Sequence, residues 1–387
     1  MEETTTNHPL PESSSSPSER PLKIPKTQPQ LERDRNEEEQ EEGEEERVES
    51  SSFVDKPMAS PRNPRLQRYL VAVEYIGSRF SGSQKQLSAR TVVGVLEEAF
   101  HKFIGQPVSI SLSSRTDAGV HALSNVCHVD VERISKRKPN EVLPPHEPSV
   151  VRKAVNHFLQ KNEGDITVVD VRSIPPDFHA RFRAQERTYF YRLLSGPEPP
   201  STFEKDRAWH VPEDLNLVAM QEACEVLVGH HDFSSFRASG CQAKSPIRTL
   251  DQLSVSEMVP TPNFPSTMTK AESNAHGEDP HSCCSKSSTV SPIESTLVER
   301  TAVGSDDGSD LGFGIRRQHR CFVVTARARS FLYHQVRLLV GVIKAAGIGD
   351  LTVSDVERIL NAKSISATPP MAPAHGLYLG HVKYDFP

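Results

Sequence analysis

The chain has 387 residues, of which 36% are hydrophobic and 25% charged, and its formal net charge is −6. None of its six cysteines forms a Cys-x-x-Cys pair, which argues against a disulfide scaffold or a zinc site and favours a reducing compartment. No stretch approaches 18 apolar residues, so we expect no membrane-spanning segment. A soluble intracellular protein is expected, in the cytoplasm or nucleus in preference to an organelle, because the acidic N-terminal stretch is unlike a transit peptide.

Two stretches differ in composition from the rest. Residues 1–62 are rich in Ser, Pro and Glu, and the first 60 hold 16 acidic against 7 basic side chains. A segment at about 258–312 is similar, and strand-like sequence flanks it on both sides. Such compositions bury too little apolar surface to offset chain entropy, so we expect a disordered acidic tail and a disordered insertion. The remaining chain is basic, which suits a polyanion such as RNA.

Hydrophobic periodicity predicts a mixture of strands and helices in the rest of the chain. The expected strands cover about 68–75, 107–113, 124–131, 165–171, 185–194, 248–256, 320–326 and 376–384. The expected helices cover about 92–103, 149–160, 214–228, 331–346 and 354–362. Strands and helices do not alternate strictly, which favours an α+β fold with an N-terminal half at 65–175 and a C-terminal half at 176–387. No Gly-rich phosphate loop is present, so no nucleotide cofactor is expected.

The most informative run is 113–121, which reads SSRTDAGVH. It places Asp117 two residues after Arg115, in a glycine-containing loop between two predicted strands. A nearby arginine favours the ionised form of a carboxylate, as a reactive acid requires. The alternative is an aspartate that only caps the turn, and on spacing alone this is the commoner situation.

A strand with aromatic side chains could lie beside Asp117. Period-two geometry places Arg187, Tyr189 and Tyr191 on one strand face. Aromatic rings beside a cation are typical of surfaces that stack an unpaired base and hold its phosphate. An ordinary core strand explains two tyrosines equally well.

A predicted helix supplies a second cation. His334, Arg337 and Gly341 fall on one helical face, beside an apolar face that predicts burial. A buried arginine requires a carboxylate partner, and Asp117 is a candidate. A further segment, 177–183, contains one histidine and two arginines that could bind phosphates or be solvated.

Together these segments resemble the TruA-type tRNA pseudouridine synthases. Residues 115–121 are similar to the catalytic signature of that family, with Asp117 at its essential aspartate. Further motifs recur in the same order at 177–182, 187–189, 232–237, 331–341 and 376–379. The resemblance covers about 65–385. The amino-acid sequence around the signature is most similar to the eukaryotic pseudouridine synthase-like branch. One departure is Ser83, which stands where the family often has tryptophan in a Gly-Trp-Gln-x-Gln loop.

The resemblance implies a fold and an activity. The fold would be two ferredoxin- or RRM-like halves that form one extended mixed sheet with a central cleft. The activity would be isomerisation of uridine to pseudouridine in RNA, with tRNA as the expected partner and with no cofactor or metal. Bacterial relatives are homodimers, so a homodimer is a further expectation.

The resemblance also implies roles for particular residues. Asp117 would be the nucleophile and Arg337 would keep it ionised. Arg115 would occupy the space that the flipped base leaves. Tyr189 would stack on the flipped uracil, and Leu379 or its neighbour Leu377 would pack against the other side of the ring.

Two other function classes compete with this interpretation. The first is a non-catalytic RNA-binding protein on the same scaffold, in which Asp117 is only a turn residue. The second is a hydrolase with paired carboxylates, such as a nucleosidase. No second acid stands beside Asp117 within its loop, which disfavours the hydrolase.

Overall fold

The computed structural model describes residues 66–138, 141–161, 163–259 and 319–386. All of these belong to one compact unit of the chain, Pro57–Pro387. The expected tail and nearly all of the expected insertion lie outside the described residues, so their disorder stays a prediction.

The first half of the fold is a βαββαβ unit. Its elements are β1 (Leu66–Tyr75), α2 (Val92–Ile104), β2 (Ile110–Leu112), β3 (His121–Glu132), α3 (Pro148–Gln160) and β4 (Ile166–Ile174). The strands lie in the order β4-β1-β3-β2, and each neighbouring pair is antiparallel. This order and connectivity are those of a ferredoxin-like unit.

The second half repeats the same connectivity. Its main elements are β5 (Ala184–Ser195), α4 (Leu217–Leu227), β8 (Ile247–Met258), β9 (Arg320–Ala328), α5 (Gln335–Gly347) and β10 (Leu377–Tyr384). These strands lie in the order β10-β5-β9-β8. The additions are β6 (Trp209–Val211), β7 (Gly229–Asp232), α6 (Val353–Ala362) and short 3₁₀ turns, among them η2 (Thr202–Glu204).

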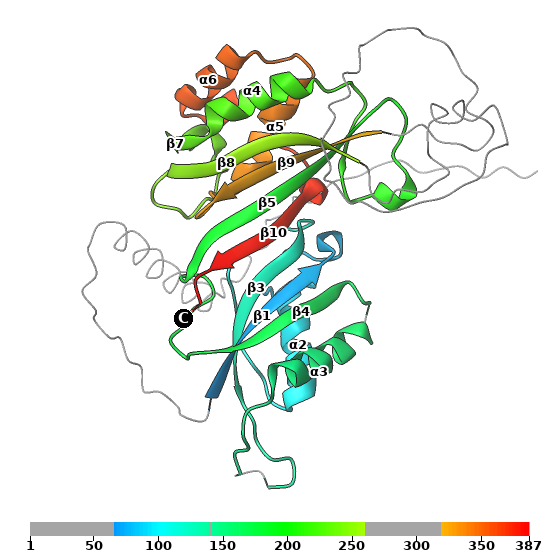
Figure 1. Cartoon of the computed structure of the whole chain (residues 1–387), viewed down its shortest axis with the longest axis vertical. Coiled ribbons are helices and arrows are strands. Elements are labelled where there is room, and N and C mark those ends of the chain that lie inside the picture. Colours follow the sequence, from blue (N-terminus) through cyan, green and yellow to red (C-terminus); the bar gives the residue numbers. More distant parts are fainter. Residues whose placement is uncertain (1–65, 139–140, 162, 260–318, 387) are drawn as a thin grey trace, which may run out of the picture. The chain divides into compact units, whose positions relative to one another are not determined.

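Strand β10 joins the halves into one ten-stranded sheet. It runs antiparallel to β5 and parallel to β3, where Tyr378 and Leu379 pair with His121 and Ala122. Figure 1 shows β10 (red) between β5 and β3, with α2 and α3 beside one half of the sheet and α4 to α6 beside the other. The predicted α+β class and the single extended mixed sheet are confirmed. The division at residues 175 and 176 stays a prediction.

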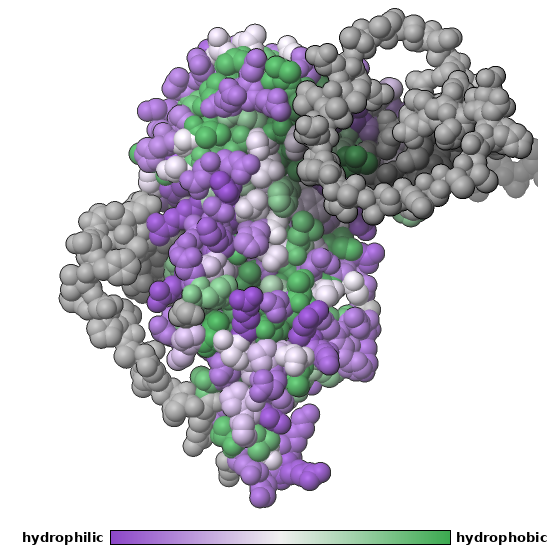
Figure 2. Space-filling view, viewed as in Figure 1, coloured by the Kyte–Doolittle hydropathy of each residue, from purple (hydrophilic) through white to green (hydrophobic). Residues whose placement is uncertain are grey.

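Each half has its own hydrophobic core. The first-half core packs α2 and α3 against β1, β3 and β4, and β10 contributes Leu379 and Val382 to it. The second-half core packs α4, α5 and α6 against β5, β8 and β9. Figure 2 shows hydrophilic and hydrophobic residues interspersed over the drawn face, as is normal for protein surfaces.

Several predicted boundaries differ from the structure for local reasons. The helix predicted at 331–346 begins at Gln335, because His334 has a left-handed backbone with φ 62°. The helix predicted at 214–228 begins at Leu217, because the Asn216 side chain accepts hydrogen bonds from the first backbone N–H groups. Strands β6 and β7 have only three and four residues, too few for a periodic signal. Within the described residues, no helix is both long enough and apolar enough to cross a membrane.

Candidate active site

Asp117 lies in the loop between β2 and β3. Its backbone carbonyl accepts a hydrogen bond from the Val120 N–H at 3.1 Å, which closes a four-residue turn. The third residue of this turn, Gly119, has φ 85°, a conformation that glycine adopts without steric cost. The turn therefore fixes the backbone of Asp117 directly before β3.

Buried polar side chains support the residue before Asp117. The Ser83 hydroxyl accepts from the Thr116 N–H at 2.7 Å, and the Tyr75 hydroxyl lies 2.7 Å from Thr116 Oγ1. Asn125 Nδ2 donates to the Tyr75 oxygen at 3.1 Å and to the Ser114 carbonyl at 3.0 Å. Burial raises the pKa of Tyr75 to about 12, so its hydroxyl stays protonated within this network. This network preorganises the loop before any substrate binds.

The second half brings two nitrogen-bearing side chains to the Asp117 carboxylate. His334 Nε2 lies 3.2 Å from Oδ2, and Arg337 Nη1 lies 3.9 Å from the same oxygen. The side chain of Asp117 is 29% exposed, against 17% for His334 and 12% for Arg337. The acid is therefore open to a substrate, while the groups that hold it are largely shielded from water.

Arg337 is fixed by its own contacts. Its Nε donates to the Ala372 carbonyl at 2.8 Å, and the Ala372 N–H donates back to the Arg337 carbonyl at 3.1 Å. Gly341 makes this approach possible, because a Cβ there would lie 2.6 Å from the Pro370 carbonyl oxygen. Burial lowers the pKa of the Arg337 guanidinium, and the Asp117 charge acts in the opposite direction. An arginine remains charged at neutral pH despite such a shift.

Tyr189 on β5 completes the surroundings of the acid. Its ring packs edge-on against Phe331, with centroids 5.2 Å apart, and its hydroxyl lies near the Ser114 side chain. Burial is the main cause that raises the pKa of Tyr189, and the electrostatic influence of Tyr75 and of Asp117 adds to it. The phenol is therefore neutral at physiological pH.

The other two members of the predicted strand face have structural contacts. Tyr191 is fully buried, and its hydroxyl donates to the Pro373 carbonyl at 2.7 Å. Arg187 donates to the carbonyls of Ser113 and Arg181, each at 3.1 Å, and to that of Arg329. Tyr191 is therefore an ordinary core residue, as the alternative interpretation of this strand expected. Arg187 connects the start of the Asp117 loop to β5.

The remaining predicted site residues lie at different depths. Arg115 is exposed, and its Nη1 donates to Gln242 Oε1 at 3.1 Å. Leu379 has no exposed surface and belongs to the first-half core, and Leu377 is 5% exposed and belongs to the second-half core. The structure thus brings Asp117, Tyr189 and Arg337 together, with Arg115 two residues from the acid and the leucines beneath the surface.

His334 is the contact residue that the sequence did not place at the site. In the sequence, His334 lies three residues before Arg337 on the same expected helical face. This proximity is the signal that could have indicated His334 as a site residue. In the structure it precedes the helix, and its left-handed backbone makes it the N-cap of α5.

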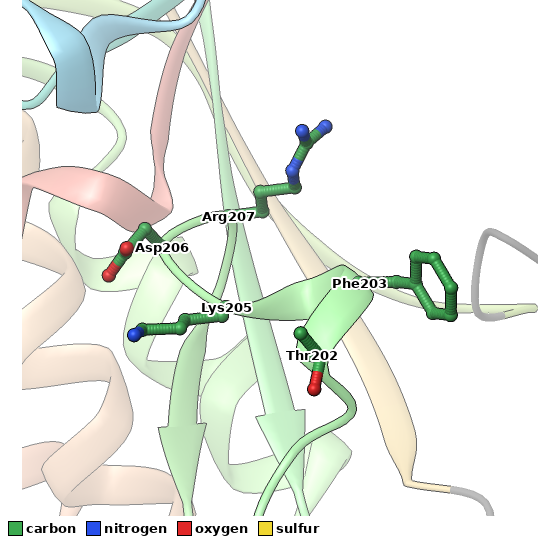
Figure 3. A pocket seen from close by; sticks show the side chains of 5 residues that line it. All are labelled: Thr202, Phe203, Lys205, Asp206 and Arg207. Carbon is green, nitrogen blue, oxygen red and sulfur yellow. The ribbon is translucent and has the colours of Figure 1, made fainter.

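The pocket in Figure 3 lies on the face of the sheet opposite to Tyr189. It has a volume of about 530 Å³, and its side chains fan out from one loop formed by Thr202, Phe203, Lys205, Asp206 and Arg207. Arg192 holds this loop through two bonds to Glu204, at 2.8 and 2.9 Å. Arg192 and Tyr189 are three residues apart on β5, in a stretch without a register shift, so they point to opposite faces. Elsewhere in the described ranges, no group of three or more His, Cys, Asp or Glu residues could hold a metal ion.

Comparison with known proteins identifies the family. The family model described as tRNA pseudouridine synthase matches residues 71–183 and 223–385. The chain is 34% identical to tRNA pseudouridine synthase A of Bartonella tribocorum over 319 residues, which is 82% of this chain and 100% of the relative. It is 36% identical to tRNA pseudouridine synthase A of Rhodospirillum centenum over 319 residues, with the same two shares. The chain therefore belongs to the tRNA pseudouridine synthase family.

Proposed function

We propose that this protein isomerises uridine to pseudouridine in tRNA. The observation that carries the proposal is the partly exposed Asp117 carboxylate, which contacts His334 and Arg337 and lies close to Tyr189. A non-catalytic RNA-binding surface would not need a carboxylate held in this way. The names of the relatives support the same activity.

The reaction conserves every atom of the nucleotide. The bond from uracil N1 to ribose C1′ breaks, and a bond from C5 to C1′ forms. The C5 proton leaves and N1 gains a proton. Asp117 would act as the nucleophile, at ribose C1′ or at the uracil ring, and Arg337 would keep it ionised.

The target base must leave the RNA stack before Asp117 can reach it, at a cost of a few kcal/mol. Arg115 is exposed in the same loop and would occupy the space that the base leaves. Tyr189 would stack on the extruded uracil. Leu379 is the register partner of Tyr189 on β10, and it would form the opposite wall after a local opening of the surface above it.

The oligomeric state is part of this proposal. A homodimer is expected from the family resemblance, and sedimentation equilibrium of the full chain tests it. A mass that stays at 43.0 kDa over the working concentration range would contradict it.

Incubation of the purified protein with uridine-containing tRNA tests the activity. We expect pseudouridine from the wild-type protein and none from Asp117→Ala. Release of free uracil would indicate a nucleosidase instead. Unchanged RNA with tight binding by both proteins would indicate a binding protein without catalysis.

A further inference from the structure

We propose that His334 is a positioning residue for Asp117. In this proposal the imidazole fixes the direction of the carboxylate and presents one of its oxygens to the substrate. The inference rests on the proposed function and adds a residue to it.

The first observation is that both contacts from the second half meet the same oxygen. His334 Nε2 and Arg337 Nη1 lie 3.2 and 3.9 Å from Asp117 Oδ2. Both contacts approach the carboxylate at Oδ2, so in this proposal Oδ1 is the oxygen that attacks.

The two contacts differ in kind. A separation of 3.9 Å is too long for a hydrogen bond, so Arg337 stabilises the negative charge without setting the direction of the carboxylate. At 3.2 Å, His334 Nε2 is in close polar contact with Oδ2, so it restricts the direction of the carboxylate. Arg337 thus stabilises the negative charge of the Asp117 carboxylate, and His334 sets the direction of that carboxylate. An Nε2–H is available in the cationic imidazole and in one neutral tautomer, so the role does not require a protonated histidine.

The second observation is the backbone of His334. With φ 62° and ψ 6°, it is one of only three non-glycine residues with positive φ in the described part of the chain. Such strain in a residue with a large side chain persists where the surrounding structure imposes it, and it is frequent at functional sites. Here it places the imidazole at the hairpin loop of the other half.

Neighbouring residues then hold the imidazole in place. The Tyr333 ring stacks on it, with centroids 3.8 Å apart and planes 25° apart. The Tyr333 carbonyl accepts from the Ala238 N–H at 3.2 Å, and the Tyr333 N–H donates to Cys241 Sγ at 3.5 Å. The His334 carbonyl accepts from the Leu338 N–H at 3.0 Å, which starts α5.

A set of three variants tests the proposal. His334→Ala removes the donor, whereas His334→Gln keeps an amide N–H at about the reach of Nε2. Both replacements meet the same backbone strain, so the difference between them reports the polar contact with Asp117. His101→Ala, an exposed histidine on α2, is the control for a change of histidine as such. The measurements are the single-turnover rate of pseudouridine formation, the Kd for tRNA and the Tm.

We expect His334→Ala to lower the single-turnover rate about 10- to 100-fold, because the acid loses its alignment. The Kd should stay within about twofold of wild type, because no phosphate contact is lost. His334→Gln should recover most of the rate, and His101→Ala should equal the wild type. A wild-type rate for His334→Ala would overturn the positioning role alone, and so would a His334→Gln rate as low as that of His334→Ala at the same Tm. Absence of pseudouridine with the wild-type protein would overturn the proposed function, and this inference with it.

Discussion

The two halves have the same connectivity, yet their equivalent helices are buried to different extents. Helix α3 follows the third strand of the first half and buries Val151, Val155 and Leu159 along one face. Helix α5 follows the third main strand of the second half, and 11 of its 13 residues are buried. A helix that packs on most of its sides is a rigid support. Arg337 on α5 is thus held by core packing, whereas Asp117 is held by a hydrogen-bonded hairpin loop of the first half.

This difference explains how a duplicated architecture produces a single site. The first half supplies the acid on an exposed loop that a substrate can reach. The second half supplies the partners of the acid from a buried helix and from the strand β5. Substitutions in either half test this division.

Among the residues that surround Asp117, the largest effect should come from Arg337, its charged partner in the second half. Arg337→Met removes the charge near Asp117 but keeps most of the side-chain volume, so we expect a loss of about 100-fold in single-turnover rate. Arg337→Lys should recover little, because one ammonium cannot serve both the Ala372 carbonyl and Asp117 in the geometry of the guanidinium. Rapid-quench analysis of pseudouridine formation measures both variants. A wild-type rate for Arg337→Met would place the electrostatic support of Asp117 elsewhere.

The next effect concerns acid stability and should originate in the first half. His128 on β3 is buried against His179. Burial lowers the pKa of both imidazoles to about 4, and the charge of His179 for His128, and of Arg68 for His179, adds to this effect. An ordinary histidine pKa near 6.5 in the unfolded chain means that the unfolded state binds protons first as pH falls. The contribution of this pair to the free energy of unfolding should be fully present above pH 6.5. It should decrease by about 2 to 3 kcal/mol between about pH 6.5 and 4.

Urea titrations at closely spaced pH values measure this loss. The matched variant is His128→Gln, which cannot titrate and should show a smaller loss over the same interval. An equal loss in both proteins would exclude His128 as the source of the acid sensitivity.

The smallest effect should come from the hydroxyl of Tyr189. Tyr189→Phe keeps the ring that stacks on Phe331 and, in the proposed mechanism, on uracil. It loses only the polar contact of the hydroxyl near Ser114, so the rate should fall by about three- to tenfold, comparable to one neutral hydrogen bond. Steady-state kinetics with tRNA should show the change in kcat and not in KM. Equal kcat values for the variant and the wild type would exclude any proton role of the hydroxyl.

Much of the fold could be predicted from the sequence because the elements have strong local signals. Helix α2 begins at Val92 as predicted, because Thr91 caps it and a regular apolar stripe follows. The α+β class followed from the order of strands and helices. The predicted start of α5 was wrong, because hydrophobic periodicity cannot detect a residue with a left-handed backbone such as His334.

The site was only partly predictable for a different reason. Asp117 and Arg337 are far apart in the sequence, and no local pattern specifies a contact between two halves. The family resemblance named these residues, whereas the direct contact of His334 with Asp117 depends on one backbone angle and emerges only in three dimensions. Ser83, at the expected tryptophan position, likewise gains its role only from its bond to the Thr116 backbone.

The central claim is that the Asp117 carboxylate is the nucleophile. Asp117→Asn tests it most directly, because the amide has nearly the same size but carries no charge and has an NH2 donor in place of one carboxylate oxygen. We expect pseudouridine formation to fall by about 10,000-fold or more, while the Tm and the Kd for tRNA stay near the wild-type values. Substantial pseudouridine formation by Asp117→Asn, with the substitution verified by mass spectrometry, would contradict the account.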